Sequence, residues 1–276
     1  MTGRPRLERP PVELAVLGGA LGAVWDGLLA LADAVGDLPW TVVGGQMVFL
    51  HAAEHGVAVH RVSADIDAAV DLRADPAGLA KLVAALTSLG FESVGESPEG
   101  HAYRFERPDH RGVAAVDLAV DTDDVAVRVD VLAPEGLGAH ADLRTVGTGT
   151  AFPAQGISQA LVRTELVAVR SAGTARWVPR PNLLGAIVSK ATAITVDAVD
   201  TDRHRQDLAF LCGLVADPFA IAAGVTKKDR FRLRGAAATF PSDHRAWRSA
   251  AVPRDAQVVL DTLIGDEDPS SRRPPW

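Results

Sequence analysis

Residues 42–71 constrain the fold of this chain more than any other stretch. An apolar run ends there at a glycine pair, a helix-like run follows, and a second apolar run begins at Asp65-Ile66-Asp67. Successive side chains of a β-strand point to opposite faces, so we expect Asp65 and Asp67 on one face and Ile66 in a core. The order of strand, glycine turn, helix and strand predicts a fold of the α/β or α+β class.

The same stretch predicts a site for phosphate and metal. Two carboxylates as close as those of Asp65 and Asp67 repel each other unless a cation lies between them. Mg²⁺ takes oxygen ligands and is commonly shared with phosphate groups. Gly44 and Gly45 carry no Cβ, so a phosphate can approach the N–H groups at the start of the following helix. We therefore expect this part of the chain to handle a nucleotide.

Length and composition are those of a folded protein with one large domain or two smaller ones. The chain has 276 residues, of which 47% are hydrophobic and 23% charged. The apolar run at residues 14–25 is shorter than the roughly 20 residues that span a bilayer, so we expect no membrane partner. The single cysteine, Cys212, excludes an internal disulfide and a zinc site built from cysteines. The cytoplasm is the simplest compartment for such a chain.

Charge is unevenly distributed along the sequence. The whole chain carries −7, but residues 227–254 hold eight basic residues against two acidic ones, which makes that stretch +6 and the remainder −13. The basic residues are Lys227, Lys228, Arg230, Arg232, Arg234, Arg245, Arg248 and Arg254. They form either a solvated helix face or a patch that guides a polyanion, since phosphate contacts dominate the affinity of proteins for nucleic acids.

Periodicity and turn residues predict the remaining elements. We expect helices at 13–34, 46–55 and 76–89, strands at 38–43, 65–72, 101–106, 113–120 and 125–132, a loop at 136–156, a hairpin of 161–169 with 175–178, and helices at 179–194, 202–214, 218–223, 227–239, 243–250 and 254–264. The pattern predicts a core domain at 12–178 and a helical C-terminal domain at 179–265, with flexible tails at 1–11 and 266–276.

The helix expected at residues 46–55 carries His51, Glu54 and His55 in the order of an H-x-x-E-H zinc-peptidase motif. We see no downstream helix with a glutamate to complete such a site. We therefore interpret the three residues as polar groups on the exposed side of a packed helix.

Four segments, taken in order, resemble the nucleotidyltransferase superfamily in the spacing typical of the AbiEii/AbiGii-type (MenT-like) toxins. They are Gly44-Gly45, the run Arg61-x-Ser63-x-Asp65-Ile66-Asp67, the strand Val127-Arg-Val-Asp-Val-Leu-Ala-Pro134, and Ser189-Lys190 followed by Arg203-His-Arg-Gln-Asp207-Leu208. Nineteen residues separate Gly45 from Asp65, as in this branch of the superfamily. The resemblance covers residues 38–214 and implies a nucleotidyltransferase-type mixed sheet with flanking helices.

The resemblance implies three metal-binding carboxylates, Asp65, Asp67 and Asp130, for Mg²⁺ or Mn²⁺. Such a set suits two-metal catalysis, in which one ion activates the attacking hydroxyl and the other holds the triphosphate. Asp117 lies in a similar local pattern and is the alternative third carboxylate. We prefer Asp130 because the residues after it match the family better.

The resemblance also implies the contacts to the nucleotide. The nucleotide-binding residues are Gly44, Gly45, Gln46, Arg61, Ser63 and Lys190, and the catalytic residues are Asp65, Asp67, Asp130, Lys190 and Asp207. Asp207 is expected to orient Lys190 or Arg205. The family often has an arginine one to two turns after the lysine, which residues 191–199 lack, so the triphosphate contacts depend on whether Arg203 or Arg205 substitutes for it.

The function implied is transfer of a nucleoside monophosphate from an NTP to a hydroxyl acceptor. As a toxin of a toxin–antitoxin pair, the protein would modify RNA, plausibly a tRNA 3′ end, and would have a cognate antitoxin protein. One alternative is a small-molecule acceptor, as in antibiotic-modifying members of the superfamily. Another is a non-catalytic module that binds a nucleotide or a partner on the same fold.

Overall fold

A computed structural model describes residues 4–14, 19–59, 61, 63–108, 126–138, 140–197, 200–249 and 255–265. The chain divides into two compact units, residues 1–186 and 187–276. The division falls within helix α5 (Leu183–Val196). The predicted strand at 113–120 with Asp117, the basic residue Arg254 and the C-terminal tail lie outside the described residues.

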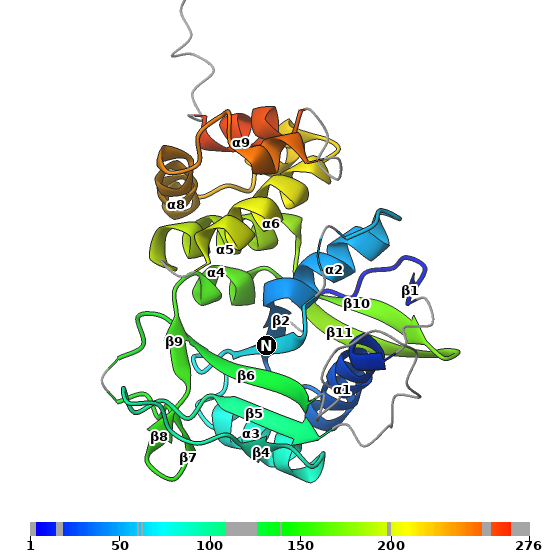
Figure 1. The fold of residues 1–276 in the computed structure, drawn as a ribbon, viewed down its shortest axis with the longest axis vertical. Helices are drawn as coiled ribbons and strands as arrows, with labels where there is room; N and C mark the ends of the chain where they lie inside the picture. The colour runs from blue at the N-terminus through cyan, green and yellow to red at the C-terminus, as the bar shows by residue number, and fades with distance from the viewer. Residues whose placement is uncertain are drawn as a thin grey trace, which may run out of the picture. The chain divides into compact units, whose positions relative to one another are not determined.

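A mixed sheet forms the centre of the first unit (Figure 1). Its strands run in the order β2 (Trp40–Val43), β3 (Asp65–Val70), β6 (Ala126–Pro134), β5 (Arg104–Pro108) and β4 (Glu92–Ser93), and β9 (Phe152–Ala154) also pairs with β6. β3 and β6 are parallel, whereas β2–β3, β6–β5 and β5–β4 are antiparallel. Together with the helices this arrangement confirms the predicted α+β class.

One face of the sheet is apolar because the strands alternate. Ile66 of β3 and Val129 of β6 are register partners, and both are fully buried. Helices α1 (Gly19–Val35) and α3 (Gly78–Ser88) contribute Trp25 and Leu82 to the same hydrophobic core. On the opposite face, the short helix α4 (Ile157–Val162) packs on the ends of β2, β3 and β6, where Val43, Ala69 and Leu132 lie. The rest of that face is left for polar side chains.

A second, three-stranded sheet consists of β1 (Val12–Glu13), β10 (Thr164–Ser171) and β11 (Thr174–Pro181). The predicted hairpin is present, but β11 continues through residues 179–181, which the sequence assigned to the next helix. That helix, α5, starts after Asn182, whose Oδ1 accepts a bond from Gly185 N at 2.9 Å. The chain before β1 was predicted to be a flexible arm, yet Leu7 N donates to Leu166 O of β10 at 3.0 Å.

Residues 136–156 were predicted to be a loop but contain three short strands, β7 (Arg144–Val146), β8 (Gly149–Thr150) and β9. β7 and β8 join in a tight hairpin at Gly147, whose φ of +59° favours glycine. Gly149 lies so close to the chain that an added Cβ would fall 2.3 Å from Ala102 Cβ. The glycines that predicted a loop therefore permit the tight turn and the close packing of a hairpin.

The second unit is helical, as expected. Its helices after α5 are α6 (Thr201–Gly213), α7 (Pro218–Ala222), α8 (Lys227–Ala238), the short η1 (Arg245–Arg248) and α9 (Ala256–Ile264). Asp217 caps α7 by accepting from Phe219 N and Ala220 N, and Thr226 and Asp229 form a capping box at α8. Helix α9 packs against α6, α7 and α8. None of the helices in the described ranges is long and apolar enough to cross a bilayer.

Candidate functional site

Three of the predicted carboxylates lie on one face of the central sheet. In the parallel register of β3 and β6, Asp67 pairs with Asp130 and Asp65 with Arg128. Register partners project to the same side of a sheet. Asp65 and Asp67 are partly exposed, and Asp130 is buried. This placement agrees with the expectation that Asp130 lies on a strand beside Asp65 and Asp67.

The glycine pair lies directly against this face. Gly44 begins helix α2 (Gly44–Glu54) with a φ of +64°, and a Cβ added to it would fall 1.6 Å from Asp67 Oδ2. A Cβ on Gly45 would fall 2.3 Å from Ser63 Cβ and 3.5 Å from an Arg61 guanidinium nitrogen. The absence of a Cβ at Gly44 therefore leaves room for the Asp67 side chain of β3, and its absence at Gly45 leaves room for Ser63 just before β3.

The Gln46 side chain contacts the backbone at the start of β3. Its side chain is buried, and its Nε2 donates to Ser63 O at 2.9 Å and to Asp65 O at 3.4 Å. The amide thus fixes the backbone that leads into β3. The backbone N–H of Gln46 is one of the first four of helix α2, which have no partner within the helix, so this group can still bind an anion.

Asp130 is held by an arginine that the sequence analysis did not single out. Arg104 of β5 donates from Nε to Oδ1 at 2.9 Å and from Nη2 to Oδ2 at 2.8 Å. The bonds to Asp130 raise the pKa of Arg104 above its ordinary value, and the nearby charge of Asp65 contributes to the rise. Arg104 and Asp130 are register partners of β5 and β6. The alternation of residues 101–106 was visible in the sequence, but this pairing was not.

The carboxylates differ in how well they suit a metal ion. Both oxygens of Asp130 already accept bonds from Arg104. Within the described ranges, no three His, Cys, Asp or Glu side chains gather closely enough to hold a metal ion. Asp65 and Asp67 share a face beside the start of α2, where phosphate or water oxygens can complete the ligands of a hard dication. Asp65 and Asp67 would hold Mg²⁺ or Mn²⁺ from this face, while Asp130 beside them accepts two bonds from Arg104.

Lys190 and Asp207 contact each other within the second unit. Lys190 Nζ of α5 lies 2.7 Å from Asp207 Oδ2 of α6, and both residues are buried. The two arginines expected to replace the missing family arginine have acidic partners on their own helix or beside it. Arg203 pairs with Asp200 at 3.3 Å, and Arg205 pairs with Asp202 at 2.9 Å. Asp207 therefore contacts Lys190, one of the two residues that the family pattern names for it, and its orienting role stays a prediction.

Comparison with known protein families and with curated proteins finds no match. The resemblance to nucleotidyltransferases is carried by the four sequence segments.

The interpretation of the H-x-x-E-H residues as an exposed polar face is wrong for His51, whereas Glu54 is partly buried and His55 is exposed. His51 is buried, with Nε2 3.1 Å from Pro181 O and Nδ1 3.1 Å from an Arg180 guanidinium nitrogen. Burial and the Arg180 charge hold the pKa of His51 well below its ordinary value. Glu54 pairs with Arg180 and with Arg9 of the N-terminal arm. The motif thus contributes to a buried ionic cluster, which we define as Arg9, His51, Glu54, Glu165 and Arg180.

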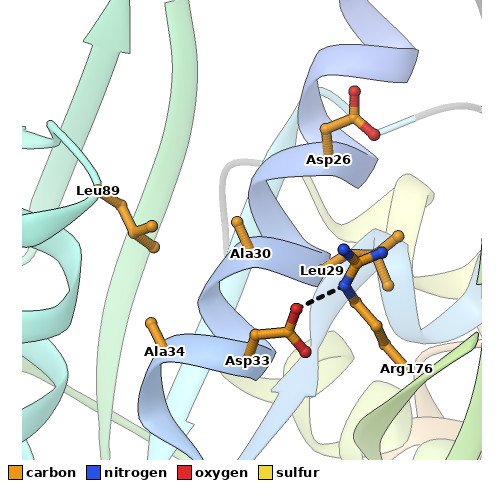
Figure 2. A pocket seen from close by; sticks show the side chains of 7 residues that line it. All are labelled: Asp26, Leu29, Ala30, Asp33, Ala34, Leu89 and Arg176. Atoms are coloured by element: carbon orange, nitrogen blue, oxygen red, sulfur yellow. Dashed lines mark hydrogen bonds and ion pairs between the residues drawn. The ribbon is translucent and has the colours of Figure 1, made fainter. Parts of the chain in front are cut away.

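Two pockets of the first unit lie away from the carboxylates. Figure 2 shows the smaller one, of about 580 Å³, beside α1, where Asp33 reaches Arg176 at 2.5 Å. The other, of about 980 Å³, is lined by Arg4 and Arg6 of the arm and by Trp177 of β11. Neither pocket is lined by Asp65, Asp67 or Asp130.

The basic stretch of the second unit is less exposed than its sequence suggests. Arg230 and Arg232 are buried, and Arg230 Nε donates to Gly265 O at 2.8 Å. Arg245 pairs with Asp202 at 2.6 Å. Lys227 and Lys228 are exposed on the first turn of α8, and the exposed Phe231 follows one turn later. Arg234, Arg245 and Arg248 are also exposed, so a polyanion would meet these arginines and the lysine–phenylalanine face formed by Lys227, Lys228 and Phe231.

Proposed function

We propose that this protein is a nucleotidyltransferase with a nucleotidyltransferase-type sheet. The observation that carries the proposal is the placement of Asp65 and Asp67 on one face of β3, with Asp67 packed over Gly44 at the start of α2. This arrangement joins a two-carboxylate cation site to the N-terminus of a helix, which favours phosphate.

In the proposed reaction, an acceptor hydroxyl oxygen bonds to the α-phosphorus of an NTP, and the bond to the bridging oxygen breaks. Pyrophosphate leaves, and the hydroxyl proton passes to a carboxylate of the site or to water. Asp65 and Asp67 would hold Mg²⁺ or Mn²⁺, which supplies charge stabilisation for the triphosphate. Gly44 and Gly45 keep the start of α2 open to the phosphates. The family pattern also assigns Lys190, which pairs with Asp207 within the second unit, to the triphosphate.

For the acceptor we propose RNA, plausibly a tRNA 3′ end, with the protein acting in the cytoplasm as the toxin of a toxin–antitoxin pair. The family pattern and the lysine–phenylalanine face of α8 support this acceptor. The net charge of −7 favours the second candidate, a small-molecule acceptor. The pairing of Asp130 with Arg104 favours the third, a module that binds nucleotides without turnover.

The test is incubation of the purified protein with Mg²⁺, total tRNA and each α-labelled NTP in turn. The control is Asp65→Asn/Asp67→Asn, which keeps the shape of both side chains and removes their charge. Label that enters RNA with the wild type alone supports transfer to RNA. Nucleotide binding without any transfer to RNA or to small hydroxyl acceptors would contradict the enzymatic proposal.

A further inference from the structure

Arg104 uses only part of its hydrogen-bonding capacity on Asp130. A guanidinium has five N–H donors, which form a side edge of Nε and Nη2 and an end edge of Nη1 and Nη2. Asp130 accepts from the side edge, at 2.9 and 2.8 Å. In the part of the chain that the structure describes, Nη1 has no hydrogen-bond partner, and the side chain is 36% exposed. The end edge is therefore available to a further acceptor.

The guanidinium is fixed beside the carboxylate pair. Arg104 lies opposite Asp130 in the sheet, and Asp130 lies opposite Asp67 on the next strand. The Tyr103 ring centroid is 5.4 Å from Arg104 Cζ. A side chain held from two directions loses little rotamer freedom when it binds a ligand.

We infer that Arg104 binds a phosphate oxyanion of the nucleotide through its end edge, and that Asp130 is a positioning residue for Arg104. The inference rests on the proposed function. A planar fork of donors matches two oxygens of a phosphate group, which a lysine cannot do. Arg104 then supplies the cation that residues 191–199 lack, while Arg203 and Arg205 stay paired with Asp200 and Asp202.

The test measures equilibrium binding of inorganic tripolyphosphate to the full chain, with and without Mg²⁺. Arg104→Ala should weaken this binding roughly 10- to 100-fold, the size of a charge-assisted pair of bonds. Arg104→Lys should recover only part of the loss. The matched control is Arg144→Ala, because Arg144 makes the same bidentate pair with Asp142, at 2.8 and 2.6 Å, on exposed β7. It should bind as the wild type does.

A second measurement separates the roles of the carboxylates. Binding of Mn²⁺ without nucleotide, followed by electron paramagnetic resonance, should weaken in Asp65→Asn and stay unchanged in Asp130→Asn, while Asp130→Asn lowers tripolyphosphate affinity. Loss of Mn²⁺ binding in Asp130→Asn, or wild-type tripolyphosphate binding in a folded Arg104→Ala, overturns the inference.

The transfer assay tells this inference apart from the proposed function. If the wild type transfers no nucleotide but Arg104→Ala still lowers the affinity for tripolyphosphate, the oxyanion site is supported and the proposed reaction is contradicted. If Asp65→Asn abolishes transfer while Arg104→Ala binds and transfers normally, the reaction stands and the inference fails.

Discussion

The fit between Gly44 and Asp67 is the tightest constraint at the scale of single residues. We predict that Gly44→Ala abolishes Mn²⁺ binding, because the new Cβ would fall 1.6 Å from Asp67 Oδ2 and must displace that carboxylate. Gly56→Ala is the matched control, since Gly56 has a φ of +65° and no atom within 4 Å of an added Cβ. The control should lose about 1 kcal/mol of unfolding free energy from backbone strain alone and keep Mn²⁺ binding. Equal Mn²⁺ affinity in the two variants would contradict the predicted cation site.

The buried pair of Lys190 and Asp207 gives a second prediction at this scale. Lys190→Met should lower the unfolding free energy by about 3–5 kcal/mol in urea titrations, because it removes the cation partner of a buried carboxylate. The double variant Lys190→Met/Asp207→Leu should lose less. As a control, Lys81→Met breaks an exposed pair with Asp75, at 2.6 Å, and should cost less than about 1 kcal/mol. Similar losses for both single variants would show that the pair is not desolvated in solution.

At the scale of elements, the buried ionic cluster links α2, β11 and the N-terminal arm through a neutral histidine. The lowered pKa of His51 means that the folded chain binds fewer protons than the unfolded chain below pH 6.5. Stability therefore falls as the pH drops from 7.5 to 5.5. We predict that His51→Gln, whose amide can bond Pro181 O, removes about 1 kcal/mol of that fall in urea titrations.

His55→Ala is the control for the pH effect, because His55 is exposed and its Nδ1 lies 2.8 Å from His51 O. It should retain the wild-type fall in stability. His204, whose pKa is also lowered by burial and by Lys190, remains in both variants and contributes equally. A wild-type pH slope in His51→Gln would mean that His51 is not held neutral.

Elements were predictable where one local signal dominated. The alternation of Asp65, Ile66 and Asp67 gave the strand and its faces, and the prolines and caps of the second unit gave its helices. Strand boundaries that depend on a distant partner were missed. Residues 179–181 look like a helix start, yet they complete a hairpin with β10. The arm looks polar and loose, yet Leu7 and Arg9 find partners in β10 and α2.

Side-chain pairing in the candidate site could not be predicted from the sequence, because it also depends on partners that are distant along the chain. Asp65, Asp67, Gly44 and Gly45 lie in one local motif, so their spacing predicted their proximity. The partner of Asp130 depends on the register of β5 against β6, which no short segment encodes. The burial of Arg230 likewise depends on a bond to the residue that follows α9. The number of basic residues in the sequence is therefore larger than the number that a ligand can contact.

At the scale of the whole molecule, the acidic net charge of −7 decides how an RNA acceptor must be bound. A polyanion is repelled by most of the chain, so binding must depend on the few exposed basic residues, such as Lys227 and Lys228 of α8. We predict that Lys227→Glu/Lys228→Glu lowers transfer to tRNA about tenfold at low salt and flattens its salt dependence, while tripolyphosphate binding is unchanged. Lys81→Glu, a reversal of charge at an exposed lysine of α3 that pairs with Asp75, is the control and should transfer normally. If the lysine reversal leaves transfer and its salt dependence intact, the acceptor does not bind this face. A wild-type rate that ignores salt would favour a small acceptor, because only a polyanion releases counterions on binding.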